Sequence, residues 1–314
     1  MVMKIYCNCN CNLIDQKICC ICDNEYEYFF SKPNVVGVGL GYKVTKGFYT
    51  KDKCIKVFVT RKLPNNQLAP QQLIPTIYKG IKTDIFQSGK LETRSLTNKV
   101  RPIIGGYSIG AVGAGSTGTL GCLVTKNNDY FILSNNHVIA RWGTVPLNTP
   151  ILQPGIQDKG NPKTDKVAVL SEYVPIKFQS VFSSPINYVD CAIAKVINKS
   201  IASSAIAFIG KPESTIVPRL NAKVQKVGRT TELTIGTVIA INCTVEVICP
   251  NNKIAKYKNQ ISTTAMEKIG DSGSVLLDEN KNIMGLLMSG GDSTTTYNPI
   301  KLVLDSLKVR IVNK

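Results

Sequence analysis

A single histidine, one serine between glycines and one aspartate are the residues of this sequence best suited to nucleophilic chemistry. His137 follows the apolar run YFIL, Ser272 lies in KIGDSGSVLL, and Asp190 opens the alternating segment VDCAIAKV. A serine hydroxyl becomes a good nucleophile when a base accepts its proton, and His137 is the only imidazole. A carboxylate then has to fix the tautomer of the imidazole and stabilise its cation. We therefore predict acyl transfer with Ser272 as nucleophile, His137 as base and Asp190 as the orienting carboxylate.

The glycines around the serine predict where the negative charge of the reaction is stabilised. Gly270 and Gly273 bracket Asp271 and Ser272 and permit a tight turn that a bulky residue could not make. Such a turn directs the amides of Gly270 and Ser272 to one side of the hydroxyl. Two converging donors are what a tetrahedral oxyanion needs, so we expect the oxyanion hole at Gly270 and Ser272.

Two other residues compete for these roles. Asp165, in TDKVAVL, is the alternative carboxylate, although its flanks are more polar. Ser108, in GYSIG, fits the G-x-S-x-G nucleophile elbow, which has to lead into a helix. The residues that follow Ser108 are AVGAGSTG, and His137 comes too soon for an acid to stand between the two in that fold. Ser108 is therefore the weaker candidate for the nucleophile.

The elements that position these residues are mostly short strands. From about residue 103, β-like runs alternate with Gly, Asn and Pro, which is typical of β-barrels or sandwiches. The end, NPIKLVLDSL, predicts a short helix. Residues 33–98 contain strands in PNVVGVGLGYKV and CIKVFVTRK and predict a small α+β unit. Its G-x-G-x-G continues into a strand, which argues against dinucleotide binding.

The motifs resemble those of trypsin-like (chymotrypsin-fold) serine peptidases, through SNNHV, VDCAIA and GDSGS in the order His, Asp, Ser. SNNHVIA is similar to the bacterial HtrA-like branch. VVGVGLGYK, LSNNHVIA, ILQPG, VQKVGRTT and GDSGS together resemble an uncharacterised bacterial group related to the plant NARROW LEAF proteins, over residues 33–314.

The resemblance implies a mainly β fold with two six-stranded-type barrels, a small α+β N-terminal unit and a short C-terminal helix. We predict a Cys-rich segment over residues 1–32, the α+β unit over 33–100, the first barrel with His137 and Asp190 over 101–203, and the second barrel with Ser272 and the helix over 204–314.

The resemblance also implies a substrate pocket. Met266, six residues before the nucleophile, stands where relatives place the base of the pocket for the residue on the amino side of the cleaved bond (P1). No carboxylate stands there, so we expect uncharged, apolar P1 residues. Ser289, Gly290 and Gly291 would form the pocket wall.

The resemblance bears on activation and disulfides too. RPIIGG resembles an activation site, but Pro102 after Arg101 disfavours cleavage there. Val138 and Lys268 stand where the animal enzymes have cysteines, so two of their usual disulfides cannot form.

Composition limits the class of partner. The chain has 38 Lys and Arg against 21 Asp and Glu, a net charge of +17, but the lysines are scattered without an aromatic-interleaved basic strip. We therefore expect no specific nucleic acid as partner. The sequence contains no apolar run of about 18 residues, the length that would predict a membrane span. The start has no apolar segment followed by a small-residue cleavage site, so we expect a cytoplasmic protein.

The cysteines leave alternatives open. The chain has eleven, an odd number that excludes a complete disulfide framework. Six crowd the start: Cys7, Cys9, Cys11, Cys19, Cys20 and Cys22. This spacing departs from that of ordinary zinc sites, so metal binding, disulfide formation and a thiol-rich tail stay open as alternatives.

Two hypotheses of function follow. The first is a serine endopeptidase that acts on a protein or peptide substrate and requires no cofactor. The second is a weak or inactive scaffold that serves as a binding or assembly module. The oligomeric state stays open.

Overall fold

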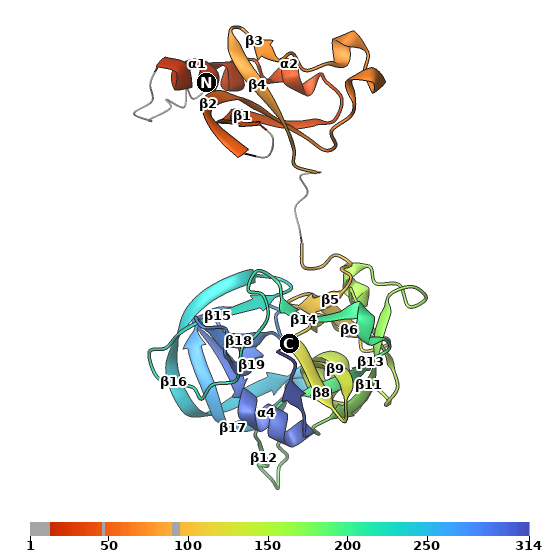
Figure 1. Cartoon of the computed structure of the whole chain (residues 1–314). Coiled ribbons are helices and arrows are strands. Elements are labelled where there is room, and N and C mark those ends of the chain that lie inside the picture. Colours follow the sequence, from red (N-terminus) through yellow and green to blue (C-terminus); the bar gives the residue numbers. More distant parts are fainter. Residues whose placement is uncertain (1–12, 46–47, 90–94, 314) are drawn as a thin grey trace. The chain divides into compact units, whose positions relative to one another are not determined.

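The computed structural model describes residues 13–45, 48–89 and 95–313, and the chain divides into two compact units, residues 1–93 and 94–314 (Figure 1). The first unit has a four-stranded sheet of order β1-β2-β4-β3, in which β2 and β4 are parallel and the other pairs antiparallel. Its elements are α1 (Leu13–Asn24), α2 (Tyr26–Phe30), β1 (Val35–Thr45), β2 (Phe48–Val59), the 3-10 turns η1 (Asn65–Gln67) and η2 (Pro70–Gln72), β3 (Ile77–Tyr78) and β4 (Ile81–Gln87).

The two helices pack against this sheet. Ile18 of α1 and Phe29 of α2 share a buried cluster with Ile55 and Val57 of β2. The alternation of apolar residues along β2 predicts this buried face, and the α+β class of the unit is confirmed. The sequence predicts a Cys-rich segment over residues 1–32 that is separate from the α+β unit, but residues 13–30 form the helices that complete the core of this unit.

The first barrel of the second unit closes through one bent segment. Its sheet runs β8-β9-β13-β11-β10-β6-β7, with β21 beside β8. The two end strands β7 and β8 are consecutive in the chain, and between them Leu120 N donates to Tyr107 O and Gly121 N to Leu133 O. Counted as one bent strand, β7 and β8 close a six-stranded barrel with the other five strands. The strands are β6 (Ser108–Ala111), β7 (Gly118–Thr119), β8 (Cys122–Lys126), β9 (Asp129–Ser134), β10 (Pro150–Leu152), β11 (Lys166–Tyr173), β13 (Ala192–Val196) and β21 (Arg310–Ile311).

The second barrel closes by direct strand pairing. Its sheet runs β17-β16-β15-β18-β19-β20, and β20 pairs again with β17, with β12 along the outer side of β17. The strands are β12 (Ile186–Asn187), β15 (Lys223–Gly228), β16 (Glu232–Cys249), β17 (Lys253–Thr264), β18 (Val275–Asp278), β19 (Ile283–Gly290) and β20 (Thr294–Pro299). Tyr297 and Leu276 are buried in its interior.

The two barrels share a core with the C-terminal helix α4 (Ile300–Leu307). Leu133 of the first barrel and Leu286 of the second belong to one buried cluster, which α4 joins through Ile300, Val303 and Leu307. The predicted fold class is therefore confirmed. The remaining elements are β5 (Ile103–Gly105), which pairs with β14 (Ala202–Ile206), the short helix α3 (Asn136–Ile139) and the 3-10 turns η3 (Arg141–Gly143), η4 (Ile156–Asp158), η5 (Lys199–Ile201) and η6 (Pro250–Asn252). Among the described residues, no helix combines the length and apolarity needed to cross a bilayer.

Candidate active site

His137 and Asp190 meet because their flanking strands pair. β9 ends at Ser134 and β13 begins at Ala192, and these two residues are partners in the antiparallel ladder. The residues just beyond β9 and just before β13 therefore lie at the same rim of the first barrel. His137 Nδ1 lies 2.5 Å from Asp190 Oδ2, and the amide of His137 donates to Asp190 Oδ1 at 3.2 Å. Two contacts to one carboxylate fix both the ring and the backbone of the histidine.

Asp190 is held from both barrels. Asn135, two residues before the histidine, donates through Nδ2 to the carbonyl of Asp190 at 2.7 Å. From the second barrel, Asn298 on β20 accepts a hydrogen bond from the amide of Asp190 at 2.9 Å. Asn298 donates in turn to Gln260 Oε1 at 2.6 Å. Asp190 is only 3% exposed, so these contacts fix its backbone in a place that water hardly reaches.

Ser272 lies on a tight turn between the two barrels. Gly270 has a φ of +102° and Gly273 a φ of +94°, which are conformations that residues with a side chain rarely adopt. The first barrel holds the turn through Thr119, whose amide donates to Ser272 O at 2.9 Å and whose hydroxyl donates to Gly270 O at 2.9 Å. The glycines thus serve the turn as the sequence predicts.

The amides of Gly270 and Ser272 donate to no hydrogen bond among the residues that the structure describes. The carbonyl of Ile269, which belongs to the same peptide group as the amide of Gly270, accepts a hydrogen bond from Thr230 Oγ1 at 2.8 Å. The C=O and N–H of a trans peptide point in opposite directions. The hydrogen bond from Thr230 therefore turns the amide N–H of Gly270 away from Thr230 and leaves this N–H available as a donor.

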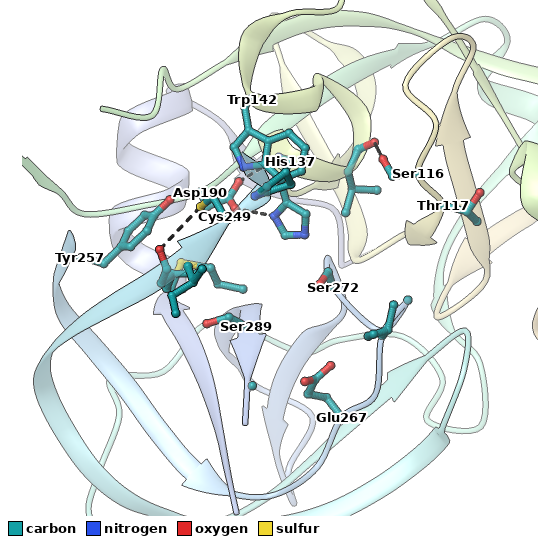
Figure 2. A pocket seen from close by; sticks show the side chains of 18 residues that line it. Ser116, Thr117, His137, Trp142, Asp190, Cys249, Tyr257, Glu267, Ser272 and Ser289 are labelled. Carbon is teal, nitrogen blue, oxygen red and sulfur yellow. Dashed lines mark hydrogen bonds and ion pairs between the residues drawn. The ribbon is translucent and has the colours of Figure 1, made fainter. Parts of the chain in front are cut away.

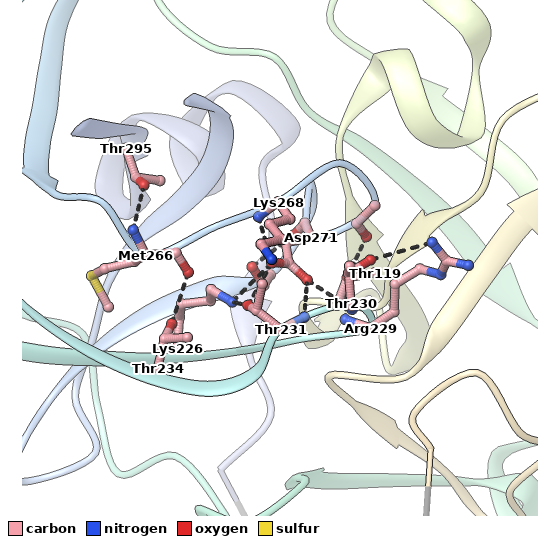
Figure 3. Close-up of polar contacts among 12 residues, drawn as sticks. Thr119, Lys226, Arg229, Thr230, Thr231, Thr234, Met266, Lys268, Asp271 and Thr295 are labelled. Carbon is pink, nitrogen blue, oxygen red and sulfur yellow. Dashed lines mark hydrogen bonds and ion pairs between the residues drawn. The ribbon is translucent and has the colours of Figure 1, made fainter. Parts of the chain in front are cut away.

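Asp271 is buried beside Ser272 and has a lysine as partner (Figure 3). Lys226 Nζ lies 3.1 Å from Asp271 Oδ2, and Thr231 Oγ1 donates to the same oxygen at 2.6 Å. Burial would raise the pKa of Asp271, but Lys226, Thr231 and the backbone amides of Lys268 and Thr230 together hold that pKa below its ordinary value. Burial also lowers the pKa of Lys226, against the opposing charge of Asp271.

His137, Asp190 and Ser272 line one cavity of about 300 Å³. Figure 2 shows the imidazole between the aspartate and the serine. The described contacts include no hydrogen bond between Ser272 Oγ and His137. Such a bond is often long before substrate binds, so its absence is compatible with a role for both groups. Trp142 stacks on the imidazole with ring centroids 5.9 Å apart and covers one face of it.

The cavity includes two of the four residues that the sequence predicts for the substrate pocket. Ser289 and Gly290 line the cavity, whereas Gly291 and Met266 do not. Met266 is buried in the core of the second barrel, because its amide donates to Thr295 Oγ1 at 2.9 Å and its carbonyl accepts from Thr234 Oγ1 at 2.8 Å. The next residue of this segment, Glu267, lines the cavity instead.

The two competing residues lie elsewhere. Asp165 pairs with Lys99 at 2.5 Å and does not line the cavity of His137. Ser108 is buried on β6 and donates to Asp158 Oδ2 at 2.6 Å. Asp158 also forms an ion pair with Arg229 of the second barrel. Ser108 therefore contributes to the contact between the barrels.

The structure describes only part of the cysteine cluster. Cys7, Cys9 and Cys11 lie outside the described residues, whereas Cys19, Cys20 and Cys22 lie on α1. Within the described part of the chain, no group of three or more His, Cys, Asp or Glu residues is arranged to hold a metal ion.

Comparison with known families identifies part of the first unit. Residues 27–86 match the family described as the NARROW LEAF 1 N-terminal domain. This match supports the predicted relationship to NARROW LEAF proteins. No curated protein matches the sequence.

Solved structures of serine proteases resemble part of this chain. Thermobifida fusca protease A is 17% identical, covers 68% of this chain and 99% of its own, and superposes with a TM-score of 0.48. An α-lytic protease homologue, N4, is 20% identical with a TM-score of 0.49 and covers 68% of this chain and 99% of its own. Deg5 is 18% identical with a TM-score of 0.40 and covers 63% of this chain and 84% of its own. Residues 27–86 thus resemble the NARROW LEAF 1 N-terminal domain, and residues 94–314 form two β-barrels, the architecture that the resemblance to chymotrypsin-fold peptidases implies.

Proposed function

We propose that this protein is a serine endopeptidase that cleaves protein or peptide substrates through an acyl-enzyme. The observation that carries the proposal is the 2.5 Å contact between His137 Nδ1 and Asp190 Oδ2, with Ser272 in the same cavity. The unpaired amides of Gly270 and Ser272 support it, because they offer donors to an oxyanion.

In the first half of the reaction, Ser272 Oγ attacks the carbonyl carbon of the substrate and His137 Nε2 accepts the hydroxyl proton. The carbonyl oxygen becomes an oxyanion that receives hydrogen bonds from the amides of Gly270 and Ser272. Asp190 stabilises the imidazolium across Nδ1. The imidazolium then gives its proton to the leaving amine as the C–N bond breaks, which leaves an ester between Ser272 and the acyl group.

In the second half, water attacks the ester carbonyl while His137 Nε2 accepts a proton from it. A second oxyanion forms at the same amides and collapses to a carboxylic acid, and His137 returns the proton to Ser272 Oγ. The enzyme is then restored.

Labelling with a fluorophosphonate probe tests the proposal, because the probe reacts with an activated serine. We expect the full-length protein to be labelled and Ser272→Ala not to be. The matched control is Ser116→Ala, which removes a hydroxyl from the same cavity without touching the proposed nucleophile. Ser108→Ala tests the competing G-x-S-x-G serine.

Labelling that persists in Ser272→Ala overturns the assignment of the nucleophile. A folded wild-type protein that neither reacts with the probe nor cleaves a denatured protein substrate overturns the proposed function. That outcome favours the binding or assembly module.

A further inference from the structure

Glu267 places a carboxylate in the cavity that contains Ser272. Figure 2 shows its side chain pointing into the cavity from below, toward the space between Ser272 and Ser289. Burial, with a smaller contribution from the charge of Asp271, raises the pKa of Glu267 above that of an ordinary glutamate. The carboxylate is thus partly removed from water.

Within the described part of the chain, this carboxylate has no hydrogen-bond or ion-pair partner. Among the described residues, no hydrogen bond and no ion pair involves the Glu267 side chain, and none of the residues that line the cavity is a lysine or an arginine. The other carboxylate of the cavity, Asp190, is occupied by His137. The protein has a net charge of +17, yet the Glu267 carboxylate gives this cavity a negative charge that no described residue pairs with.

The wall beside Glu267 leaves room for the carboxylate and for a long side chain. A Cβ atom on Gly290 would lie 2.3 Å from Glu267 Oε1, so only glycine at that position allows the observed placement. Val247 and Met288 supply apolar surface in the same cavity. The methylene stem of a lysine or arginine can pack on such surface while its charged end reaches a carboxylate.

We infer that Glu267 determines specificity by binding the basic side chain of a lysine or arginine at P1. The inference rests on the proposed peptidase function and names its substrate class. It reverses the apolar P1 preference expected from Met266, which lies in the barrel core. A cationic side chain would give the carboxylate the ion-pair partner that it lacks among the described residues. A glutamate at P1 would meet a like charge and be rejected.

Peptides that differ only at P1 test the inference. We expect wild type to cleave P1 lysine or arginine roughly 10- to 100-fold better in kcat/KM than P1 leucine, the effect of one hydrogen-bonded charge pair. Glu267→Gln should lose that preference, because its kcat/KM for P1 lysine and arginine should fall to about its kcat/KM for P1 leucine. Glu279→Gln is the matched control, because it removes an equal charge at an exposed turn of the same barrel.

A wild-type enzyme that is labelled by the probe but prefers uncharged P1 residues overturns the inference and leaves the proposed function standing. A preference for basic P1 residues that survives in Glu267→Gln also overturns it.

Binding of a cation, measured without turnover, separates this inference from catalysis. p-Aminobenzamidine carries an amidinium resembling the arginine head group, and p-aminobenzamide is its uncharged analogue. In the Ser272→Ala background we expect the amidine to bind more tightly than the amide. Adding Glu267→Gln should abolish this difference in affinity. Adding Glu279→Gln should leave the difference unchanged. Equal binding of the two compounds overturns the inference even if the protein is an active peptidase.

Discussion

Lys226 Nζ lies 3.1 Å from Asp271 Oδ2, and both side chains are completely buried. Asp271 directly precedes Ser272 in the chain. A buried ion pair gains little net stability over apolar residues, but removal of one partner leaves an uncompensated charge in the interior. This pair also fixes the turn that contains Ser272, because the same carboxylate accepts hydrogen bonds from the amides of Thr230 and Lys268.

Lys226→Met should therefore destabilise the protein by about 3 to 5 kcal/mol. Adding Asp271→Asn should recover most of that loss, because no unpaired charge then remains. Chemical denaturation measures both effects. Lys223→Met is the control, since Lys223 is an exposed residue of the same strand β15 and its loss should change stability by less than about 0.5 kcal/mol. A Lys226→Met protein as stable as the control would contradict the importance of the pair.

The same carboxylate predicts a component of acid unfolding. The pKa of Asp271 is lower in the folded chain than in the unfolded one, so the folded state favours the charged form. Its contribution to stability is fully present above the ordinary pKa of aspartate and is lost as the pH falls through the lower folded value. The free energy of unfolding, measured by chemical denaturation from pH 6 down to the lowest pH at which the protein is folded, should therefore fall more steeply in wild type than in the Lys226→Met, Asp271→Asn double variant. Parallel curves would contradict this.

The sequence predicts the two barrels and the common location of His137, Asp190 and Ser272, because each motif adjoins a short, apolar run with clear strand character. The sequence assigns the substrate pocket to Met266 and not to Glu267, and the reason for this difference from the structure is physical. Successive side chains of an extended segment point in opposite directions, so a shift of one residue exchanges the core position and the cavity position. Hydrogen bonds of Met266 to two threonines from distant strands decide which side chain turns inward.

The helices of the first unit were also missed. Ile18 and Ile21 are three residues apart, a spacing that places them on one face of a helix. The cysteines between and around them instead favour the interpretation of this region as a separate metal-binding or thiol-rich segment. Packing of that face on β2 could not be read from the segment alone, because it depends on residues more than thirty positions further along the chain.

Thr230 offers a test of how the oxyanion hole is positioned. Thr230→Val removes the hydroxyl that holds the carbonyl of Ile269 and leaves the side chain nearly the same size. If that contact directs the amide of Gly270, kcat should fall about threefold to tenfold with little change in KM, since one exposed hydrogen bond is lost. Thr237→Val on β16 is the control. A change confined to KM would contradict a role for Thr230 in positioning the amide.

Asp190→Asn tests the carboxylate that orients His137. An asparagine can keep the volume of the side chain, but its amide cannot stabilise the imidazolium and favours the wrong tautomer, which should lower kcat/KM by roughly 10⁴-fold. The fold should survive, because Asn135 and Asn298 contact the backbone of Asp190 and not its side chain. Asp165→Asn is the matched control, since it neutralises the competing carboxylate, and its kcat/KM should stay within a few-fold of wild type. If the large loss appeared in Asp165→Asn and not in Asp190→Asn, the catalytic carboxylate would have been assigned wrongly.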